Sequence, residues 1–426
     1  MALAADADDR APAGGDTERP RSLWRNRDYM FLWGGQLVST LGTGVSSIAF
    51  PLLVLALTRS AAQAGLLAAV QSLPYLVFSL PAGALVDRWD RKRVMVLCDV
   101  GRALSLASIP LAALLGHLTV AQLYLVALVE GSLFVFFNLA EVACLPRVVP
   151  TAQLPQASAQ NEGGSIAATL IGPPLGTLLF GVAGRTVPFL VDAVSYAASV
   201  ATLLRIRTRF QEERALAPRR PLLPAIREGL AWLWGHPLIR YMAFLTGGLN
   251  LVNTASTLIV IVLARAHHLP DALIGLIFTI ASIGGIAGSL LAPRIQRRFG
   301  FGTVITATVW ASTLAWPLLA LVPNPLLLGL VIAVPFMTSP IYNAVQFSYR
   351  ISLIPDHLQG RVNSSFRLLA FGGQPLGAAL SGLLIAARGP VFAVAVFWAW
   401  YLLLAVLTTL NRHLRRAGQG GAPRAA

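Results

Sequence analysis

The chain has 426 residues and a formal net charge of +15, with 56% hydrophobic and only 12% charged residues. Soluble domains carry about 25% charged residues, and a soluble core cannot bury apolar runs of roughly 20 residues that recur along a whole chain. The basic residues stand in short runs between these apolar segments, which argues against a nucleic-acid-binding module. We therefore expect a polytopic membrane protein whose solvent is the bilayer.

The first 28 residues contain no apolar core of a cleavable signal peptide, so the first membrane helix is expected to direct insertion. Apolar runs long enough to cross the bilayer then recur twelve times. The predicted membrane helices span residues 30–57, 65–86, 94–116, 119–141, 158–181, 186–204, 238–263, 271–291, 302–322, 325–348, 363–387 and 389–410. The sequence thus predicts an all-α protein made of a tail 1–28, a six-helix bundle 29–204, a linker 205–237, a second six-helix bundle 238–410 and a tail 411–426.

The distribution of basic residues predicts the orientation of these helices. Most of the 33 basic residues lie in the two tails, in the linker and in alternate loops, whereas the opposite loops hold only Arg59, Arg185, Arg265 and Arg388. The side that is richer in Lys and Arg is the cytoplasmic side. We expect a multi-pass protein of the bacterial cytoplasmic (inner) membrane with both termini in the cytoplasm.

The segment between predicted helices two and three combines a glycine with charges of both signs. Gly83 would let helices pack closely, and Asp87 stands where it can accept hydrogen bonds from the N-terminus of a facing helix. Two interpretations stay open, namely an ordinary loop of the positive side or a latch that joins the cytoplasmic ends of the two bundles through ion pairs. The residues assigned to this latch are Gly83, Asp87, Arg88, Asp90, Arg91, Lys92, Asp99, Arg102 and Glu141.

Predicted helix five is interrupted by small residues and prolines, which are Gly172, Pro173, Pro174 and Gly176. Proline removes a backbone donor and kinks a helix, and small residues permit the close approach of a neighbour. A similar segment, Gly373 to Gly377, recurs in predicted helix eleven, and residues 83–86 are echoed by residues 288–291. Repeats in matching positions indicate duplication of a six-helix unit around a central pathway.

The linker contains an amphipathic segment whose apolar face comprises Ile226, Leu230, Leu233 and Trp234. Arg227 and Glu228 lie off that face. The pattern favours a helix on the inner membrane surface, and the alternative is a flexible linker without regular structure.

Residues 83–93 resemble the loop signature of the major facilitator superfamily, Gly-x-x-x-Asp-Arg/Lys-x-Gly-Arg-Arg/Lys, with Asp90 at the second glycine position. The Asp-Arg-Trp-Asp-Arg version resembles the macrolide-efflux and enterobactin-exporter branch of drug:proton antiporters. The second copy is degraded, because Ala and Pro at 292–293 occupy its Asp-Arg positions. The proline segment of helix five resembles the antiporter signature of the superfamily, although Ala168 and Thr177 stand at two of its glycine positions.

The likeness covers nearly the whole chain. Three further segments that resemble this branch are residues 26–29, 227–230 and 360–363. The resemblance implies two pseudo-symmetric six-helix bundles, alternating access to a central site, and export of a substrate in exchange for protons.

A carboxyl group inside a membrane helix is costly and indicates function. The interiors of the predicted helices of the second half contain no Asp or Glu, so coupling carboxyls are expected in the first half. Glu130 is the first candidate, because it lies near the middle of predicted helix four, which in the superfamily faces the central cavity. Asp192 and Glu162 are the further candidates, and each of the three can instead be a structural carboxylate.

Two ion pairs are also predicted in the first half. Asp99 and Arg102 stand at positions i and i+3 of one helix, a spacing that favours an intrahelical pair. Glu141 is expected to pair with Arg88, Arg91 or Arg102. In the superfamily branch, helix one carries Gly-Asp-Gly where this chain has Gly-Thr-Gly at 42–44, so either Glu130 alone carries the coupling or the mechanism departs from that of the family.

A substrate cavity of amides and aromatic rings is predicted from helices one, four, seven and ten. Its candidate residues are Gln36, Phe134, Phe137, Asn138, Asn250, Asn253, Asn343 and Gln346. Such a cavity, poor in positive charge, would suit bulky neutral or cationic amphipathic molecules. Each amide can equally form a hydrogen bond between helices.

The sequence lacks a Gly-x-x-x-x-Gly-Lys-Ser/Thr loop, a convergent nucleophile and base, and a metal-ligand cluster, so we predict neither ATP-driven transport nor an enzyme, a metal or a cofactor. We predict a secondary transporter that exports an amphipathic drug, antibiotic or siderophore-like metabolite in exchange for protons. Its partners are the substrate, protons and the lipid bilayer, and a monomer supplies both halves of the pathway. The alternatives are an uncoupled facilitator or lysophospholipid carrier, and a membrane sensor that does not transport.

Overall fold

The computed structural model describes residues 23–86, 88–211, 222–355 and 358–419, and the elements in these ranges are helices. Twelve of them are long and apolar enough to cross a membrane. The first half contains α1 (Arg27–Thr58), α2 (Ala61–Val86), α3 (Arg91–Leu114), α4 (Val120–Val148), α5 (Leu154–Leu178, continued by a π-helical turn Leu179–Ala183) and α6 (Val187–Arg205). The second half contains α8 (Pro237–Ala266), α9 (Asp271–Arg298), α10 (Phe301–Ala315, continued by a 3₁₀ turn Trp316–Ala320), α11 (Pro325–Leu353), α12 (Gln359–Arg388) and α13 (Pro390–Leu410). Two shorter helices are α7 (Leu222–Gly235) and α14 (Arg412–Gln419).

The twelve predicted membrane helices are confirmed in number and order, but several extend further than predicted. The fourth, predicted to end at residue 141, runs to Val148. The eighth, predicted to end at residue 291, runs to Arg298 as α9. Apolar runs mark only the part of a helix that lies in hydrocarbon, whereas the backbone of α9 stays helical through charged residues beyond it. Because α7 belongs to the linker, α8 to α13 are the seventh to twelfth membrane helices.

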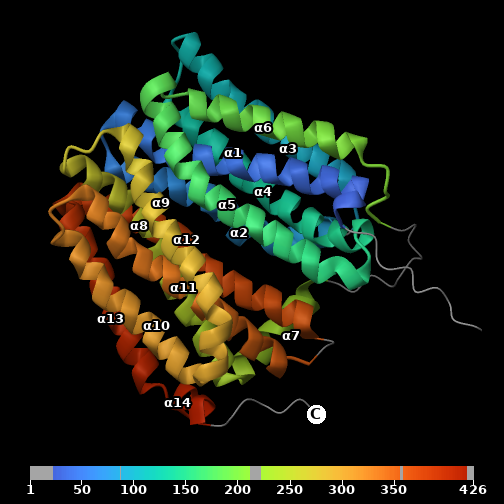
Figure 1. Ribbon diagram of the computed structural model, residues 1–426, viewed down its shortest axis with the longest axis vertical. Coiled ribbons are helices and arrows are strands. Elements are labelled where there is room, and N and C mark those ends of the chain that lie inside the picture. The colour runs from blue at the N-terminus through green and yellow to red at the C-terminus, as the bar shows by residue number, and fades with distance from the viewer. Residues whose placement is uncertain (1–22, 87, 212–221, 356–357, 420–426) are drawn as a thin grey trace, which may run out of the picture.

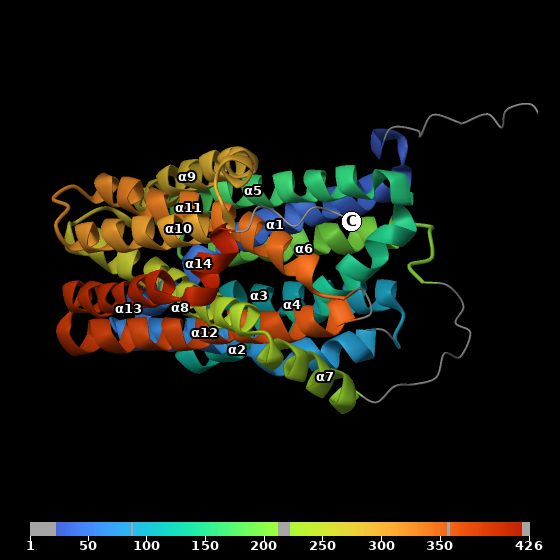
Figure 2. The same cartoon turned by 90° about the horizontal axis from the view of Figure 1, so that it is seen from below.

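Each half is a bundle of six helices with the same pattern of neighbours. In the first half α1 packs against α5 and α6, α2 packs on α4, and α3 packs on α4 and α6. In the second half α8 packs on α12 and α13, α9 packs on α11, and α10 packs on α11 and α13. The halves meet along two seams, α2 with α12 and α5 with α9, which Figure 2 shows on opposite sides of the molecule. This is the predicted arrangement of two six-helix bundles.

The repeated Gly-x-Pro-Leu-Gly segment makes the same helix crossing in both halves. A Cβ atom added to Gly172 of α5 would lie 2.6 Å from the Cα atom of Gly44 in α1. A Cβ atom added to Gly377 of α12 would lie 2.7 Å from the carbonyl carbon of Leu251 in α8. Since no real Cβ atom approaches a backbone so closely, only glycine lets these helices touch. The sequence repeat is therefore the duplication of one close helix crossing.

The other repeated glycine differs between the halves. Gly288 of α9 packs onto α11, where an added Cβ atom would lie 2.8 Å from the carbonyl carbon of Met337. An added Cβ atom at Gly83 of α2 would meet nothing within 4 Å, so the close packing predicted at Gly83 is not formed. The physical reason is that Gly83 lies at the end of α2 toward which the two halves diverge.

The described contacts between the halves gather toward one end of the molecule, which we call the loop end because the short loops 59–60, 184–186 and 267–270 lie there. In one seam Gly65 of α2 lies against Gly382 of α12. In the other, the Thr177 hydroxyl of α5 donates to the carbonyl of Ala272 at the start of α9, over 3.3 Å. The opposite end carries α7 and is called the linker end; toward it the ribbons of the two halves diverge (Figure 1).

The linker helix α7 is docked on the second half. Its Glu228 carboxylate forms an ion pair with the Arg361 guanidinium near the start of α12, and the Leu233 side chain is fully buried in the second-half core. The Trp234 side chain is exposed. Residues 222–235 are helical, so the unstructured alternative is wrong there, whereas the place of this helix on the inner membrane surface stays a prediction and residues 212–221 lie outside the described part. The segments 227–230 and 360–363, noted for their resemblance, contact each other.

Replacing Gly229 with Val is expected to loosen this docking, because an added Cβ atom would lie 2.7 Å from the carbonyl carbon of Arg361. Overpacking of this kind costs about 1–3 kcal/mol of stability. We expect a lower apparent Tm in detergent and faster proteolysis within the linker. Gly235→Val is the matched control on the same helix, because an added Cβ atom there meets nothing within 4 Å. Equal stability of the two variants would contradict the docking role of Gly229.

Candidate functional site

A central cavity of about 630 Å³ lies between the two halves. Its wall is formed by α1 to α5 of the first half and by α8, α9 and α12 of the second half. Aromatic rings line it together with hydroxyl, amide and charged groups. The polar and charged side chains in the wall include Thr43, Ser46, Gln71, Ser72, Arg102, Glu130, Asn138, Thr254, Thr257, Arg367, Gln374 and Ser381.

A second cavity of about 530 Å³ runs within the first half toward the linker end. Its wall includes Gln36 of α1, Glu141 of α4 and Glu162 of α5. The two cavities share four wall residues, which are Thr43, Arg102, Phe134 and Asn138. We call this second cavity the first-half cavity. The side chain of Arg102 lies where the first-half cavity and the central cavity meet.

Glu130 is held by two neighbours on α3. The Arg102 Nε atom donates to one oxygen of Glu130 over 3.1 Å, and the Ser105 hydroxyl donates to the other oxygen over 3.1 Å. Both side chains of the ion pair are only 6% exposed. A buried pair of this kind is stable only because each charge compensates the other. Glu130 thus lies in the cavity wall as predicted, and its partner is Arg102.

Asp192 of α6 lies beside this pair. Its carboxylate accepts hydrogen bonds from the hydroxyls of Ser46 in α1 and Ser195 in α6. The ring of Tyr196, one helical turn along α6, has its centre 4.1 Å from the Arg102 guanidinium carbon. The Tyr196 hydroxyl also shares a 2.7 Å hydrogen bond with Thr43 of α1. The cluster therefore connects α1, α3, α4 and α6 in the interior of the first half.

The cluster contains more carboxyl groups than cations. Arg102 interacts electrostatically with Glu130, Asp192 and Asp99, and all four residues are buried. One guanidinium can balance only one carboxylate, and an uncompensated charge inside a membrane protein is costly. A neutral cluster therefore requires protons on two of the three carboxyl groups. A carboxyl group in such a cluster has the chemistry to bind or release a proton.

Two predicted ion pairs are not formed, and both expectations are corrected. Arg102 bonds to Glu130 on the neighbouring helix instead of to Asp99 in its own helix, and neither carboxyl oxygen of Asp99 has a hydrogen-bond partner. Glu141 forms no ion pair with Arg88, Arg91 or Arg102 in the described part of the chain, and it lines the first-half cavity instead. For the first pair, the physical reason is that the Arg102 guanidinium bonds to Glu130 of α4 and lies over the Tyr196 ring of α6, so its hydrogen bond goes to a neighbouring helix.

The predicted latch residues contact the first half. Asp90 caps α3 by accepting a hydrogen bond from the Arg93 amide. Arg91 donates to the carbonyl of Ala143 in α4 over 2.8 Å, and Lys92 donates to the carbonyl after α6, at Ile206, over 2.7 Å. Asp87 lies outside the described residues. These bonds tie the starts and ends of α3, α4 and α6 together, and a latch to the second half stays a prediction.

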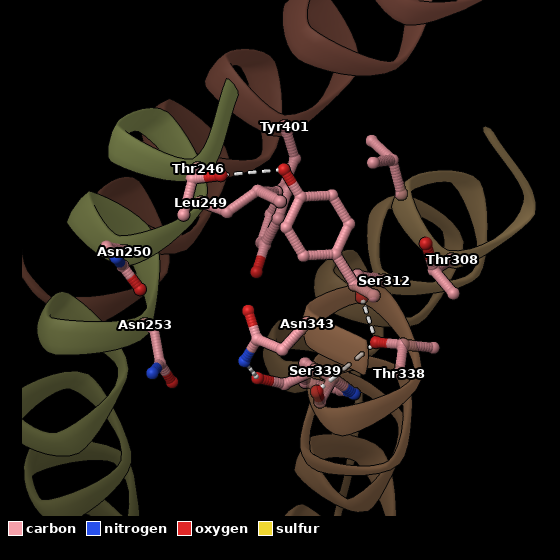
Figure 3. A pocket seen from close by; sticks show the side chains of 13 residues that line it. Thr246, Leu249, Asn250, Asn253, Thr308, Ser312, Thr338, Ser339, Asn343 and Tyr401 are labelled. Atoms are coloured by element: carbon pink, nitrogen blue, oxygen red, sulfur yellow. Dashed lines mark hydrogen bonds between the residues drawn. The ribbon is translucent and has the colours of Figure 1, made fainter. Parts of the chain in front are cut away.

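The residues that were predicted to line one substrate cavity lie in different cavities of the structure. Phe134 and Asn138 line the central cavity, whereas Gln36 and Phe137 line only the first-half cavity. A third cavity of about 60 Å³ lies within the second half and has room only for a few water molecules. It is lined by amides from two helices, which Figure 3 shows facing each other: Asn250, Asn253 and Asn343.

Two of the amides that were predicted to line the substrate cavity have other places: one forms a hydrogen bond between helices, and one is buried. The Asn250 amide donates to the carbonyl of Ala370 in α12 over 2.8 Å, so it bonds two helices together. Gln346 is buried and lies outside the walls of the three cavities. The expectation of a centre poor in positive charge is also corrected, because Arg102 and Arg367 both line the central cavity.

The sequence contained a signal for cavity residues that the predictions missed. Arg367, Phe371, Gln374, Ala378 and Ser381 of α12 all line the central cavity. Their spacing is that of one helix face, and this face carries an arginine, an amide and a hydroxyl in residues 367–387 of α12, which are otherwise apolar. Such a polar stripe predicts a helix that faces a cavity instead of lipid.

Comparison with known sequences and structures agrees with this architecture. The family profile described as "Transmembrane secretion effector" matches residues 20–424. The multidrug efflux pump Tap of Mycolicibacterium fortuitum is 29% identical over 409 residues, which cover 91% of this chain and 96% of Tap. The enterobactin exporter EntS of Citrobacter koseri is 26% identical over 375 residues, which cover 88% of this chain and 89% of EntS.

Solved transporter structures share the fold at low sequence identity. The nucleoside transporter NupG superposes with a TM-score of 0.71 at 16% identity, covering 90% of this chain and 98% of NupG. An inward-facing bacterial homologue of the lysosomal transporter Spinster superposes with a TM-score of 0.71 at 14% identity, covering 93% of this chain and 99% of that one. With twelve candidate membrane spans in two bundles around a central cavity, the chain belongs to the transmembrane secretion effector family of major facilitator superfamily transporters.

Proposed function

We propose that this transporter exports amphipathic small molecules from the cytoplasm in exchange for protons. The observation that carries the proposal is the buried Arg102–Glu130 pair in the wall of the central cavity. A carboxyl group that faces a transport cavity, inside a cluster with surplus acid, can carry a proton from one side of the membrane to the other. The similarity to an efflux pump and to a siderophore exporter favours export over uptake.

The proposed cycle starts from the state described here, in which the halves diverge toward the linker end. With that end in the cytoplasm, substrate reaches the central cavity from inside the cell. Rocking of the two halves about the central cavity then opens the loop end and releases the substrate. Protons that arrive from outside neutralise Glu130 and weaken its attraction to Arg102, which ties proton movement to the return step.

Close packing of small residues and prolines at one seam supports such rocking. Gly275 of α9 packs against the Pro173–Pro174 segment of α5, where an added Cβ atom would lie 2.7 Å from the carbonyl oxygen of Pro173. The same segment of α5 crosses α1 at Gly172 and Gly44. The segment that resembles the antiporter signature thus lies between the interior of the first half and the moving seam, where it can transmit a change in helix position.

The test is energised transport of a panel of lipophilic dyes and macrolides in everted vesicles that contain the protein. We expect uptake into these vesicles, which corresponds to export from cells, and its collapse when a protonophore dissipates the proton gradient. Vesicles without the protein provide the blank. Transport that continues unchanged with the protonophore would show an uncoupled facilitator instead, and no transport of any compound by folded protein would contradict export of this substrate class.

A further inference from the structure

The central cavity contains a cation without a counter-charge. Arg367 lies eight residues after the start of α12 and points its side chain into the cavity wall. Among the described residues, Arg367 forms neither an ion pair nor a hydrogen bond. The other arginine of the cavity, Arg102, is compensated by Glu130. The described wall of the central cavity therefore carries one surplus positive charge.

Within the described part of the second half, Arg367 has no carboxylate partner. The second half contains only two acidic residues, Asp271 and Asp356. Asp271 is bound by Arg265 at the loop end, with the two groups 2.7 Å apart, and Asp356 lies outside the described residues. Orientation of the chain does not require Arg367 either, because topology is determined by basic residues in loops. Arg367 is exposed and faces the central cavity, so its guanidinium is free to bind an anion there.

The surroundings of Arg367 have the chemistry of a site for a flat apolar body. The guanidinium carbon lies 5.8 Å from the ring centres of both Tyr75 in α2 and Phe371 in α12. These two rings contact each other edge to face across the seam, with their centres 5.1 Å apart. Gln71 and Gln374 line the same cavity and place amide groups one to two helical turns away. The site thus combines a cation, amide donors and aromatic rings from both halves.

We infer that the exported molecule is an amphipathic anion, whose acidic group binds to Arg367 while its aromatic or flat apolar body packs against Tyr75 and Phe371. This inference rests on the proposed export function and names its substrate class. A guanidinium binds a carboxylate or phosphate through two parallel hydrogen bonds, which a neutral or cationic molecule cannot reproduce. Because the rings belong to α2 and α12, the bound molecule would also contact both moving halves at once.

Equilibrium binding of three naphthalene probes to the purified protein tests the inference. The probes are 2-naphthoic acid, 2-naphthamide and 2-naphthylmethylamine, which share a ring system and differ in charge. Binding is measured by fluorescence anisotropy in nanodiscs of zwitterionic lipid, with empty nanodiscs as the blank. We expect the acid to bind at least about tenfold more tightly than the amide, and the amine to bind most weakly, as a charge-assisted hydrogen bond predicts.

The variants assign this preference to one side chain. Arg367→Gln is expected to remove the preference for the acid while the affinity for the amide changes by less than about twofold, and Arg367→Lys to keep part of the preference because lysine offers a point charge. Arg388→Gln removes the same charge from the same half outside the cavity and should leave all three affinities unchanged. Equal binding of acid and amide by the wild-type protein, or an equal loss of all three probes in Arg367→Gln, would overturn the inference.

The result is separable from that of the transport test. Binding is measured without a proton gradient, so an uncoupled carrier of anions would still prefer the acid. Conversely, a proton-driven exporter of neutral compounds would pass the vesicle test and bind the acid and the amide alike. Failure of one experiment therefore leaves the outcome of the other informative.

Discussion

Proton-driven export is expected to fall to the level of protein-free vesicles when Glu130 is replaced by Gln. Glutamine has nearly the shape of a protonated glutamate but cannot release a proton, so the cluster is fixed in its protonated form. Removing one partner of a buried ion pair costs about 3–5 kcal/mol when the other charge is left unpaired. Here Asp192 and Asp99 remain close enough to Arg102 to compensate part of that loss.

The measurement separates coupling from folding by using substrate counterflow, which exchanges labelled for unlabelled substrate and needs no net proton movement. Glu130→Gln should retain counterflow while it loses gradient-driven export. Glu162, an exposed carboxyl in the first-half cavity, is the rival coupling residue. If Glu162→Gln lost gradient-driven export and Glu130→Gln retained it, the role assigned to Glu130 would be wrong.

A leucine at Gly382 is expected to force the loop end open. An added Cβ atom at Gly382 of α12 would lie 2.9 Å from the Cα atom of Gly65 in α2, so the two backbones cannot keep their present contact. Overpacking costs about 1–3 kcal/mol, and a free-energy difference of that size changes the ratio of two states by a factor of roughly 5–150. The state described here would therefore lose population to a state that is open at the loop end, and export would slow accordingly.

The change of state can be measured by labelling of a cysteine placed at Thr257, in the wall of the central cavity. A membrane-impermeant maleimide should label it from outside intact cells faster in the Gly382→Leu background than in the wild-type background. The native residues Cys98 and Cys144 are buried and give little background. Gly34→Leu is the matched control, because an added Cβ atom there meets nothing within 4 Å. Unchanged labelling in Gly382→Leu would contradict a seam closed by this glycine.

The helices could be predicted from the sequence because the bilayer imposes a length and a composition on each of them. Repeated Gly-x-Pro-Leu-Gly segments also predicted the duplication, since only glycine permits the crossings at Gly172 and Gly377. The ends of α4 and α9 were predicted too early, because charged residues continue a helix beyond the hydrocarbon without leaving an apolar signal. The docking of α7 on α12 could not be predicted, since it depends on a contact between Gly229 and the Arg361 backbone that joins distant segments.

The site was only partly predictable. Glu130 stood out as a carboxyl in the middle of an apolar helix, and its place in the cavity wall followed from the resemblance to the superfamily, in which this helix faces the central cavity. Its partner was missed because spacing within α3 favoured a pair between Asp99 and Arg102, whereas the direction of the Arg102 side chain depends on how α3 packs against α4 and α6. The amides of α8 and α11 were assigned to the centre, but the rotation of these helices in the bundle turns several of them toward the second-half interior.

The packing of α2 on α12 at Gly65 and Gly382 determines which external conditions are expected to affect the opening of the loop end. The described contacts that close the loop end are backbone-to-backbone packing and hydrogen bonds to Thr177, whereas the ion pair at that end, Arg265 with Asp271, joins two helices of the same half. Packing forces are short-ranged and are not screened by salt. The ionic strength of the solution at the loop end is therefore expected to have little effect on how often this end opens. Lateral pressure and lipid thickness, which press or spread the helices themselves, are instead expected to change its opening frequency.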